Sequence, residues 1–115
     1  MSDAARQELA AAASTVTGVT GHPRYVQTTR PGNVLVRRNR TEYPNRFGGV
    51  AFWDLYVVGP QDFGASETYF ETVVPQLVEA LAPVLAVTVV TYQLTDFGQG
   101  SIPTAVISGH REEEE

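Results

Sequence analysis

The run of residues 50–58, Val-Ala-Phe-Trp-Asp-Leu-Tyr-Val-Val, limits the possible folds more than any other segment. It is β-branched, aromatic and apolar except for Asp54, which is typical of a strand in the interior of a sheet. Alternation gives the strand two apolar faces, one carrying Trp53 and the other carrying Phe52, Asp54 and Tyr56. We therefore expect a sheet with helices on one face and a neighbour partly covering the Asp54 face of this strand.

Two segments have helical periodicity. Residues 3–14 are rich in alanine, with Ser2 or Asp3 as a cap, and Gly18 ends the segment. Residues 66–82 form a second helix with Ser66 as its N-cap, and Pro75 should kink or divide it. Its apolar stripe is broad and consists of Phe70, Val73, Val74, Leu77, Val78 and Leu81. This stripe predicts that the helix closes the gap to the sheet completely.

Three further strands are expected at residues 33–38, 84–94 and 102–108, the last starting near Pro103 or lying at an edge. Residues 18–32 are predicted to be mostly loop, with a short extended piece within 25–29, and residues 39–49 to be a long loop or open hairpin connection. The fold class is therefore α+β with the order α-β-β-α-β-β: two helices on one face of a four-stranded, mainly antiparallel sheet. Residues 1–110 form a single domain, and residues 111–115 form an acidic disordered tail.

Composition excludes several classes of protein. The chain has 115 residues, 43% hydrophobic and 18% charged, which fits one folded domain rather than a disordered chain. It has no cysteine, which excludes disulfides, thiolate nucleophiles and zinc–thiolate sites. The longest apolar stretch, residues 81–90, is shorter than the roughly 18 residues of a membrane helix. The first residues carry an acid and no apolar run after Arg6, so we expect no secretory signal.

The charges are unevenly distributed. All eight basic residues are arginines, which reflects either forked, partly buried contacts or a GC-rich genome. Six of them lie within residues 24–46 together with one acid, Glu42, and the other segments are acidic. Tyr25, Tyr43 and Phe47 are interleaved with these arginines. This pattern is compatible with a nucleic-acid surface and with a protein interface; the acidic net charge of −5 favours the interface.

Residues that carry chemistry are few. His22 and His110 have no neighbours at metal-ligand spacing, so we interpret both as surface histidines. The glycine-rich segment 98–101 stands between two strands and is better explained as a hairpin turn than as a phosphate loop. Asp54 is interpreted as an edge or surface residue, or as the partner of an arginine. We expect no catalytic residue, metal or cofactor, and hence no enzyme.

The order of segments resembles that of a known family. An alanine-rich helix, a Gly/Pro loop, the strand at 33–38, a basic loop and the aromatic strand at 52–58 are followed by the helix containing Phe70 and residues 75–81, and by two closing strands. Over residues 3–109 this layout resembles the tail terminator or head-to-tail neck proteins of long-tailed bacteriophages, particularly those of actinobacterial hosts.

The resemblance implies a structural virion protein. Such a subunit forms a ring, usually a hexamer, that caps the tail tube and contacts tail tube and neck or head-completion proteins. DNA passes through the ring without specific binding, no membrane is involved, and assembly takes place in the host cytoplasm. The residues expected at the subunit interface are Arg37, Arg38, Arg40, Arg46, Tyr43, Phe47, Phe52 and Tyr56.

Two alternatives remain open from the sequence. One is a small nucleic-acid-binding module that uses the arginine-rich segment 24–46. The other is an enzyme or small-ligand domain, which requires a pocket between the second helix and the sheet.

Overall fold

The computed structural model describes residues 2–24, 30–45, 48–96, 98 and 100–113. In chain order, its elements are α1 (Ser2–Ser14), β1 (Thr20–His22), β2 (Asn33–Asn45), β3 (Gly48–Val58), α2 (Phe63–Leu81), β4 (Ala86–Asp96) and β5 (Ser101–Glu113). The α+β class is confirmed. The predicted strand count is wrong, because the sheet has five strands and the element order is α-β-β-β-α-β-β.

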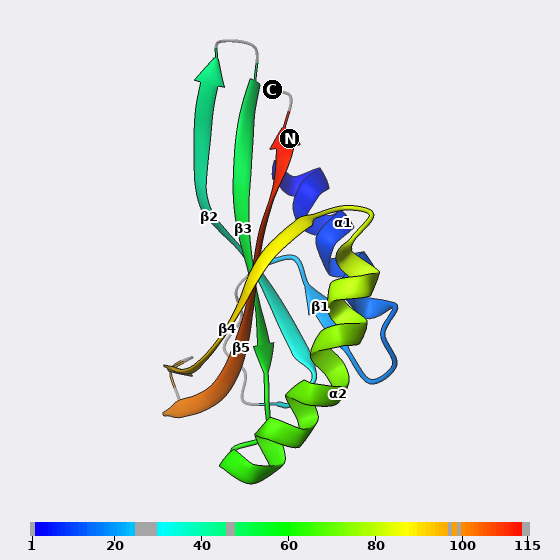
Figure 1. Cartoon of the computed structure of the whole chain (residues 1–115), viewed down its shortest axis with the longest axis vertical. Coiled ribbons are helices and arrows are strands. Elements are labelled where there is room, and N and C mark those ends of the chain that lie inside the picture. Colours follow the sequence, from blue (N-terminus) through cyan, green and yellow to red (C-terminus); the bar gives the residue numbers. More distant parts are fainter. Residues whose placement is uncertain (1, 25–29, 46–47, 97, 99, 114–115) are drawn as a thin grey trace.

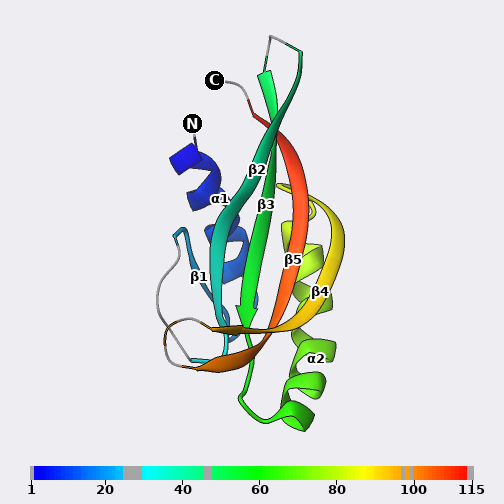
Figure 2. The same cartoon turned by 90° about the vertical axis from the view of Figure 1, so that its left-hand side faces the viewer.

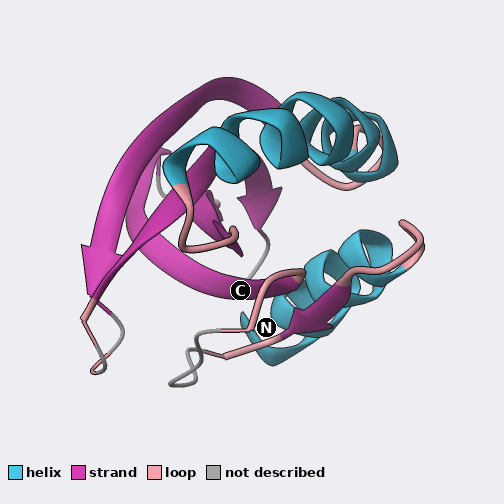
Figure 3. Ribbon diagram, turned by 90° about the horizontal axis from the view of Figure 1, so that it is seen from below, coloured by secondary structure: helices cyan, strands magenta, loops and turns pink. Residues whose placement is uncertain are grey.

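The strands lie in the order β1-β2-β3-β5-β4. β1 is parallel to β2, and every other neighbouring pair is antiparallel, so the sheet is mixed. Both helices lie on the same side of the sheet (Figure 1). The sheet is strongly twisted and curved when it is seen from below (Figure 3).

The strand that the sequence did not reveal is β1, which lies in a segment predicted to be loop. Its three residues pair with Asn33, Val34 and Leu35 at the start of β2. Gly21 makes this arrangement possible, because a Cβ atom at that position would collide with the backbone of Ala10 in α1. The glycine therefore lets α1 lie directly against β1. The extended piece predicted within 25–29 lies outside the described residues.

The second difference concerns strand length. Residues 39–45 are the end of β2 and residues 48–49 are the start of β3, so the hairpin alternative for 39–49 is correct and its two arms are strand rather than loop. Residues 46–47 lie outside the described residues. β5 also continues beyond the expected end at residue 108, because Arg111, Glu112 and Glu113 pair with the start of β3. The prediction of disorder is therefore wrong for 111–113. Residues 114–115 lie outside the described residues.

The helix-facing side of the sheet carries the main core. β3 contributes Ala51, Trp53, Leu55 and Val57 to it, and all four side chains are completely buried. α2 is one continuous helix that contains Pro75, so the predicted division does not occur. Its N-cap is Asp62 rather than Ser66, and the Asp62 Oδ1 accepts a hydrogen bond from the Ala65 amide at 3.0 Å.

A smaller core lies on the opposite side of the sheet, which we call the outer face. It consists of Leu35, Tyr56, Val58, Ile102 and Val106. The far end of the β4–β5 hairpin crosses in front of the lower parts of β2 and β3 (Figure 2). The cover expected over the Tyr56 side of β3 is therefore supplied in part by the chain itself. Pro103 lies near the start of β5, as expected, but β5 is an interior strand.

Candidate functional site

The outer face also carries a group of polar and aromatic side chains that spans β2, β3 and β5. We call this group the outer strip: Arg37, Asn39, Arg40, Phe52, Asp54, Tyr56, Ser108 and His110. The strand register arranges much of it in two rows. One row runs from Arg37 to Asp54 to Ser108, and the next runs from Arg40 to Phe52 to His110.

An irregularity in β2 assembles this strip. Plain alternation would place Arg38 and Arg40 on one face and Arg37 on the other. The register instead shifts between Arg38 and Arg40, so that Arg38 pairs with Trp53 and Arg40 pairs with Phe52. Asn39 is the extra residue of this β-bulge. As a result, Arg40 lies on the same face as Arg37.

Asp54 is the buried centre of the strip. Its Oδ2 accepts a hydrogen bond from Asn39 Nδ2 at 2.9 Å, and its Oδ1 accepts one from Ser108 Oγ at 2.8 Å. The expected edge or surface position is wrong, because Asp54 is only 9% exposed on a strand with neighbours on both sides. Two neutral donors from the flanking strands compensate for part of the cost of burying the carboxylate.

The arginines of the strip are held by aromatic partners. Cζ of Arg40 lies 3.9 Å from the centroid of the Phe52 ring, and its Nε lies 2.9 Å from Glu42 Oε2. The Phe52 ring in turn packs against His110, with 5.5 Å between the ring centroids. Arg37 donates a hydrogen bond to the Tyr56 hydroxyl at 3.4 Å. Such a surface of ordered arginine and aromatic side chains is typical of protein interfaces.

The structure separates the residues predicted for the interface. Arg37, Arg40, Phe52 and Tyr56 come together on the outer strip. Arg38 lies on the helix side, with its Cζ 4.8 Å from the centroid of the Trp53 ring. Tyr43 is exposed next to Gly49. Arg46 and Phe47 lie outside the residues whose side chains are described.

A basic hollow continues the strip around the edge of β2. It has a volume of about 560 Å³ and is lined by Arg6, Arg24, Val36 and Arg37. Arg6 reaches it from α1 and donates hydrogen bonds to the carbonyl oxygens of Pro23 and Val36 at 3.2 and 3.3 Å. This side of the molecule is therefore rich in positive charge.

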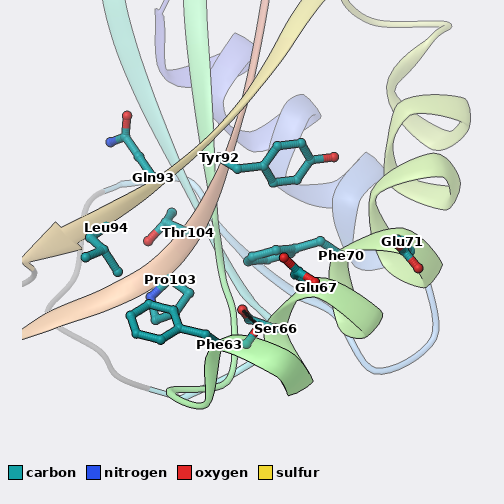
Figure 4. A pocket seen from close by; sticks show the side chains of 10 residues that line it. All are labelled: Phe63, Ser66, Glu67, Phe70, Glu71, Tyr92, Gln93, Leu94, Pro103 and Thr104. Atoms are coloured by element: carbon teal, nitrogen blue, oxygen red, sulfur yellow. Dashed lines mark hydrogen bonds between the residues drawn. The ribbon is translucent and has the colours of Figure 1, made fainter.

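A larger groove lies between the first half of α2 and the β4–β5 hairpin. It has a volume of about 630 Å³, and its lining residues are Phe63, Ser66, Glu67, Phe70, Glu71, Tyr92, Gln93, Leu94, Pro103 and Thr104. The side chains of Tyr92 and Phe70 point toward each other across it (Figure 4). The expectation that α2 closes this gap is wrong, because the end of the hairpin curls away from the helix toward the outer face (Figures 1 and 2).

The groove side of the molecule is acidic and partly apolar. The sequence has no lysine or arginine between Phe47 and His110, whereas Glu67, Glu71 and Asp96 lie on or beside the groove elements. β4 is the last strand of the sheet, and three large apolar side chains that line the groove are exposed: Phe63, Tyr92 and Leu94. Val89 of β4 is also exposed, but it pairs with Ser108 and lies on the outer face. The alternation of Tyr92 and Leu94 was the sequence signal for this surface, but it did not reveal that the helix leaves them uncovered.

Two further ionisable side chains, those of His22 and Tyr69, contact other residues of the fold or are partly buried in it. His22 Nε2 lies 3.2 Å from Asn33 Oδ1. Burial raises the pKa of Tyr69 above its ordinary value, which keeps this phenol neutral. Within the described ranges, no three residues of the types His, Cys, Asp and Glu are grouped closely enough to hold a metal ion. No helix in the described part of the chain has the length and apolar character needed to cross a membrane.

Comparison of the chain with models of known protein families and with characterised proteins found no match.

Proposed function

We propose that this chain is a structural subunit that assembles with copies of itself into a ring, and that the ring is the tail terminator of a long-tailed bacteriophage. One observation carries the proposal: two chemically unlike surfaces lie on opposite faces of one sheet. The outer face carries the arginines and aromatic rings of the outer strip. The helix-facing side carries, between α2 and the β4–β5 hairpin, a partly apolar groove with acidic residues around it.

Unlike surfaces of this kind favour head-to-tail association. When one patch meets a different patch on the next copy, the contact repeats, and the chain of copies closes into a ring if the rotation allows it. Opposite charges on the two patches steer the encounter and disfavour contacts between like surfaces. Neither patch requires a catalytic step, so the proposed role is structural.

The phage role is supported by the resemblance in layout. An alanine-rich helix, an aromatic central strand, a long apolar helix and a closing hairpin follow one another as in tail terminator and neck proteins. In this role the ring, expected to be a hexamer, caps the tail tube and joins it to neck and head-completion proteins. DNA passes through its centre, and the protein belongs to the tail or neck of the virion.

Sedimentation and electron microscopy test this proposal. We expect the purified 12.5 kDa chain to form one discrete oligomer, visible as a single fast-sedimenting species and as rings in negative stain. In virions that carry a tagged copy, we expect the label at the junction between tail and head. If purified particles lack the protein, it is not a tail terminator.

A nucleic-acid-binding module is the second candidate, and the basic hollow lined by three arginines favours it. One fact opposes it: the net charge of −5 repels a polyanion.

We therefore expect no DNA or RNA mobility shift at low salt, and no difference when Arg37, Arg38 and Arg40 are all replaced by alanine. A salt-sensitive shift that disappears in this triple variant would instead support the nucleic-acid module.

A further inference from the structure

We infer that the groove between α2 and the β4–β5 hairpin is the socket that receives the arginine-bearing outer strip of a neighbouring copy. This inference rests on the proposed assembly function and names the contact that builds it. The occupant is a second copy of this chain, and the contact is made by guanidinium groups entering a groove of aromatic rings and carboxylates.

The lining of the groove has the chemistry that binds a guanidinium group. The exposed ring of Tyr92 forms an aromatic wall of the groove and packs against the buried Phe70 ring, with 5.7 Å between the ring centroids and a tilt of 45°. Glu67 and Glu71 are one helical turn apart on α2, and both are exposed at the groove. A guanidinium group is planar, so it can stack on an aromatic ring while its N–H groups bind a carboxylate.

The chain contains the complete form of this arrangement elsewhere. On the outer strip, Arg40 lies over the Phe52 ring and simultaneously pairs with the carboxylate of Glu42. The groove presents the rings and the carboxylates, but its lining includes no lysine or arginine. The missing component is therefore a cation with an apolar stem that enters from outside the groove.

The outer strip of a second copy supplies that cation. Arg37 and Arg40 are exposed on the strip, and the chain has no lysine that would serve instead. In the sheet, the Arg40 row reaches Ala86 at the start of β4, whereas the groove is lined by Tyr92 and Leu94. Six residues of strand separate these positions by about 20 Å. One copy can therefore use its strip and its groove at the same time.

Charge reversal on each side tests this contact. We expect both Glu71→Arg and Arg40→Glu to weaken self-association by roughly 100-fold, because each replaces an attraction with a like-charge contact. The double variant in one chain should regain most of the lost affinity, since the charges are again complementary. Glu79→Arg is the matched control: it is exposed on the same helix outside the groove, and its assembly should equal that of the wild type.

Mixing the two single variants gives a sharper result. A copy with Arg40→Glu keeps its wild-type groove, and a copy with Glu71→Arg keeps its wild-type strip, so these two surfaces fit each other. The two reversed surfaces are also complementary to each other, as in the double variant. We therefore expect equimolar mixtures to regain most of the lost affinity and to assemble with the two variants alternating, whereas each variant alone stays weak. Circular dichroism of each variant must show a wild-type fold before its sedimentation is interpreted.

The possible results of these experiments distinguish the proposed contact between strip and groove from the proposed function as a tail terminator. If the wild type assembles and both reversals assemble equally well, the socket is wrong while the ring remains. If the reversals behave as expected but virions lack the protein, the phage role is wrong and the socket remains. A wild-type chain that stays monomeric at every concentration, and on tails, would overturn both.

Discussion

Replacement of Trp53 by alanine is expected to lower the free energy of unfolding by about 3–5 kcal/mol, the usual cost of truncating a large buried aromatic residue. Trp53 is the largest completely buried side chain of the structure and lies in the central strand β3. Its ring also contacts two guanidinium groups, with the Cζ atoms of Arg6 and Arg38 at 5.3 and 4.8 Å from the centroid. The substitution therefore removes core volume and two cation–π contacts together.

Urea denaturation followed by circular dichroism measures this loss, because the variant has no tryptophan fluorescence. Trp53→Phe is the control. The indole Nε1 is buried without a hydrogen-bond partner among the described residues, so phenylalanine sacrifices no hydrogen bond. We expect this control to lose about 1–2 kcal/mol, and it keeps the test informative if the alanine variant does not fold. An alanine variant within about 1 kcal/mol of the wild type would contradict the packing described here.

The second large effect is expected at Gly21. A Cβ atom at this position would collide with the backbone of Ala10, which cannot move without shifting α1 away from β1. We expect Gly21→Ala to lower the free energy of unfolding by about 1–3 kcal/mol, as overpacking usually does. Faster hydrogen exchange of the β1 amides should accompany the loss, because β1 is held between α1 and β2.

Gly64→Ala is the matched control for this substitution. Gly64 lies in the first turn of α2, where the nearest atom to an added Cβ is Asp62 Oδ1 at 3.4 Å. Alanine favours helix over glycine by about 0.5–1 kcal/mol, so this variant should be slightly more stable than the wild type. Equal destabilisation at the two positions would show that the close approach of α1 and β1 is not the cause.

The parts of the fold that were predictable are those determined by local composition. The strand at 50–58 and the two helices follow from runs of residues whose propensity and periodicity agree. β1 could not be predicted in this way, because its three residues include only one with a strand preference, Thr20, followed by Gly21 and His22. They are extended because the distant segment 33–35 lies beside them. The charged end of β5 is a strand for the same reason, since it pairs with the start of β3.

The candidate site was predictable by residue type but not by geometry. The arginines and aromatic residues of β2 and β3 could be identified from the sequence. Their distribution between the two faces depends on the bulge at Asn39, which no local rule locates. The groove was missed because the apolar stripe of α2 predicts contact along its whole length. The contact between α2 and the sheet ends where the β4–β5 hairpin bends away from the helix, and the composition of the helix does not reveal this position.

The smaller core on the outer face has a mechanical consequence for the groove. Ile102 and Val106 of β5 pack there against Leu35, Tyr56 and Val58. The β4–β5 hairpin is therefore held by apolar contacts on the side that faces away from the groove. These contacts hold the hairpin at the outer face and oppose its movement toward α2, which would close the groove. For the partner proposed above, the groove is already open before binding, so no free energy is spent on opening it, which favours rapid docking with little rearrangement.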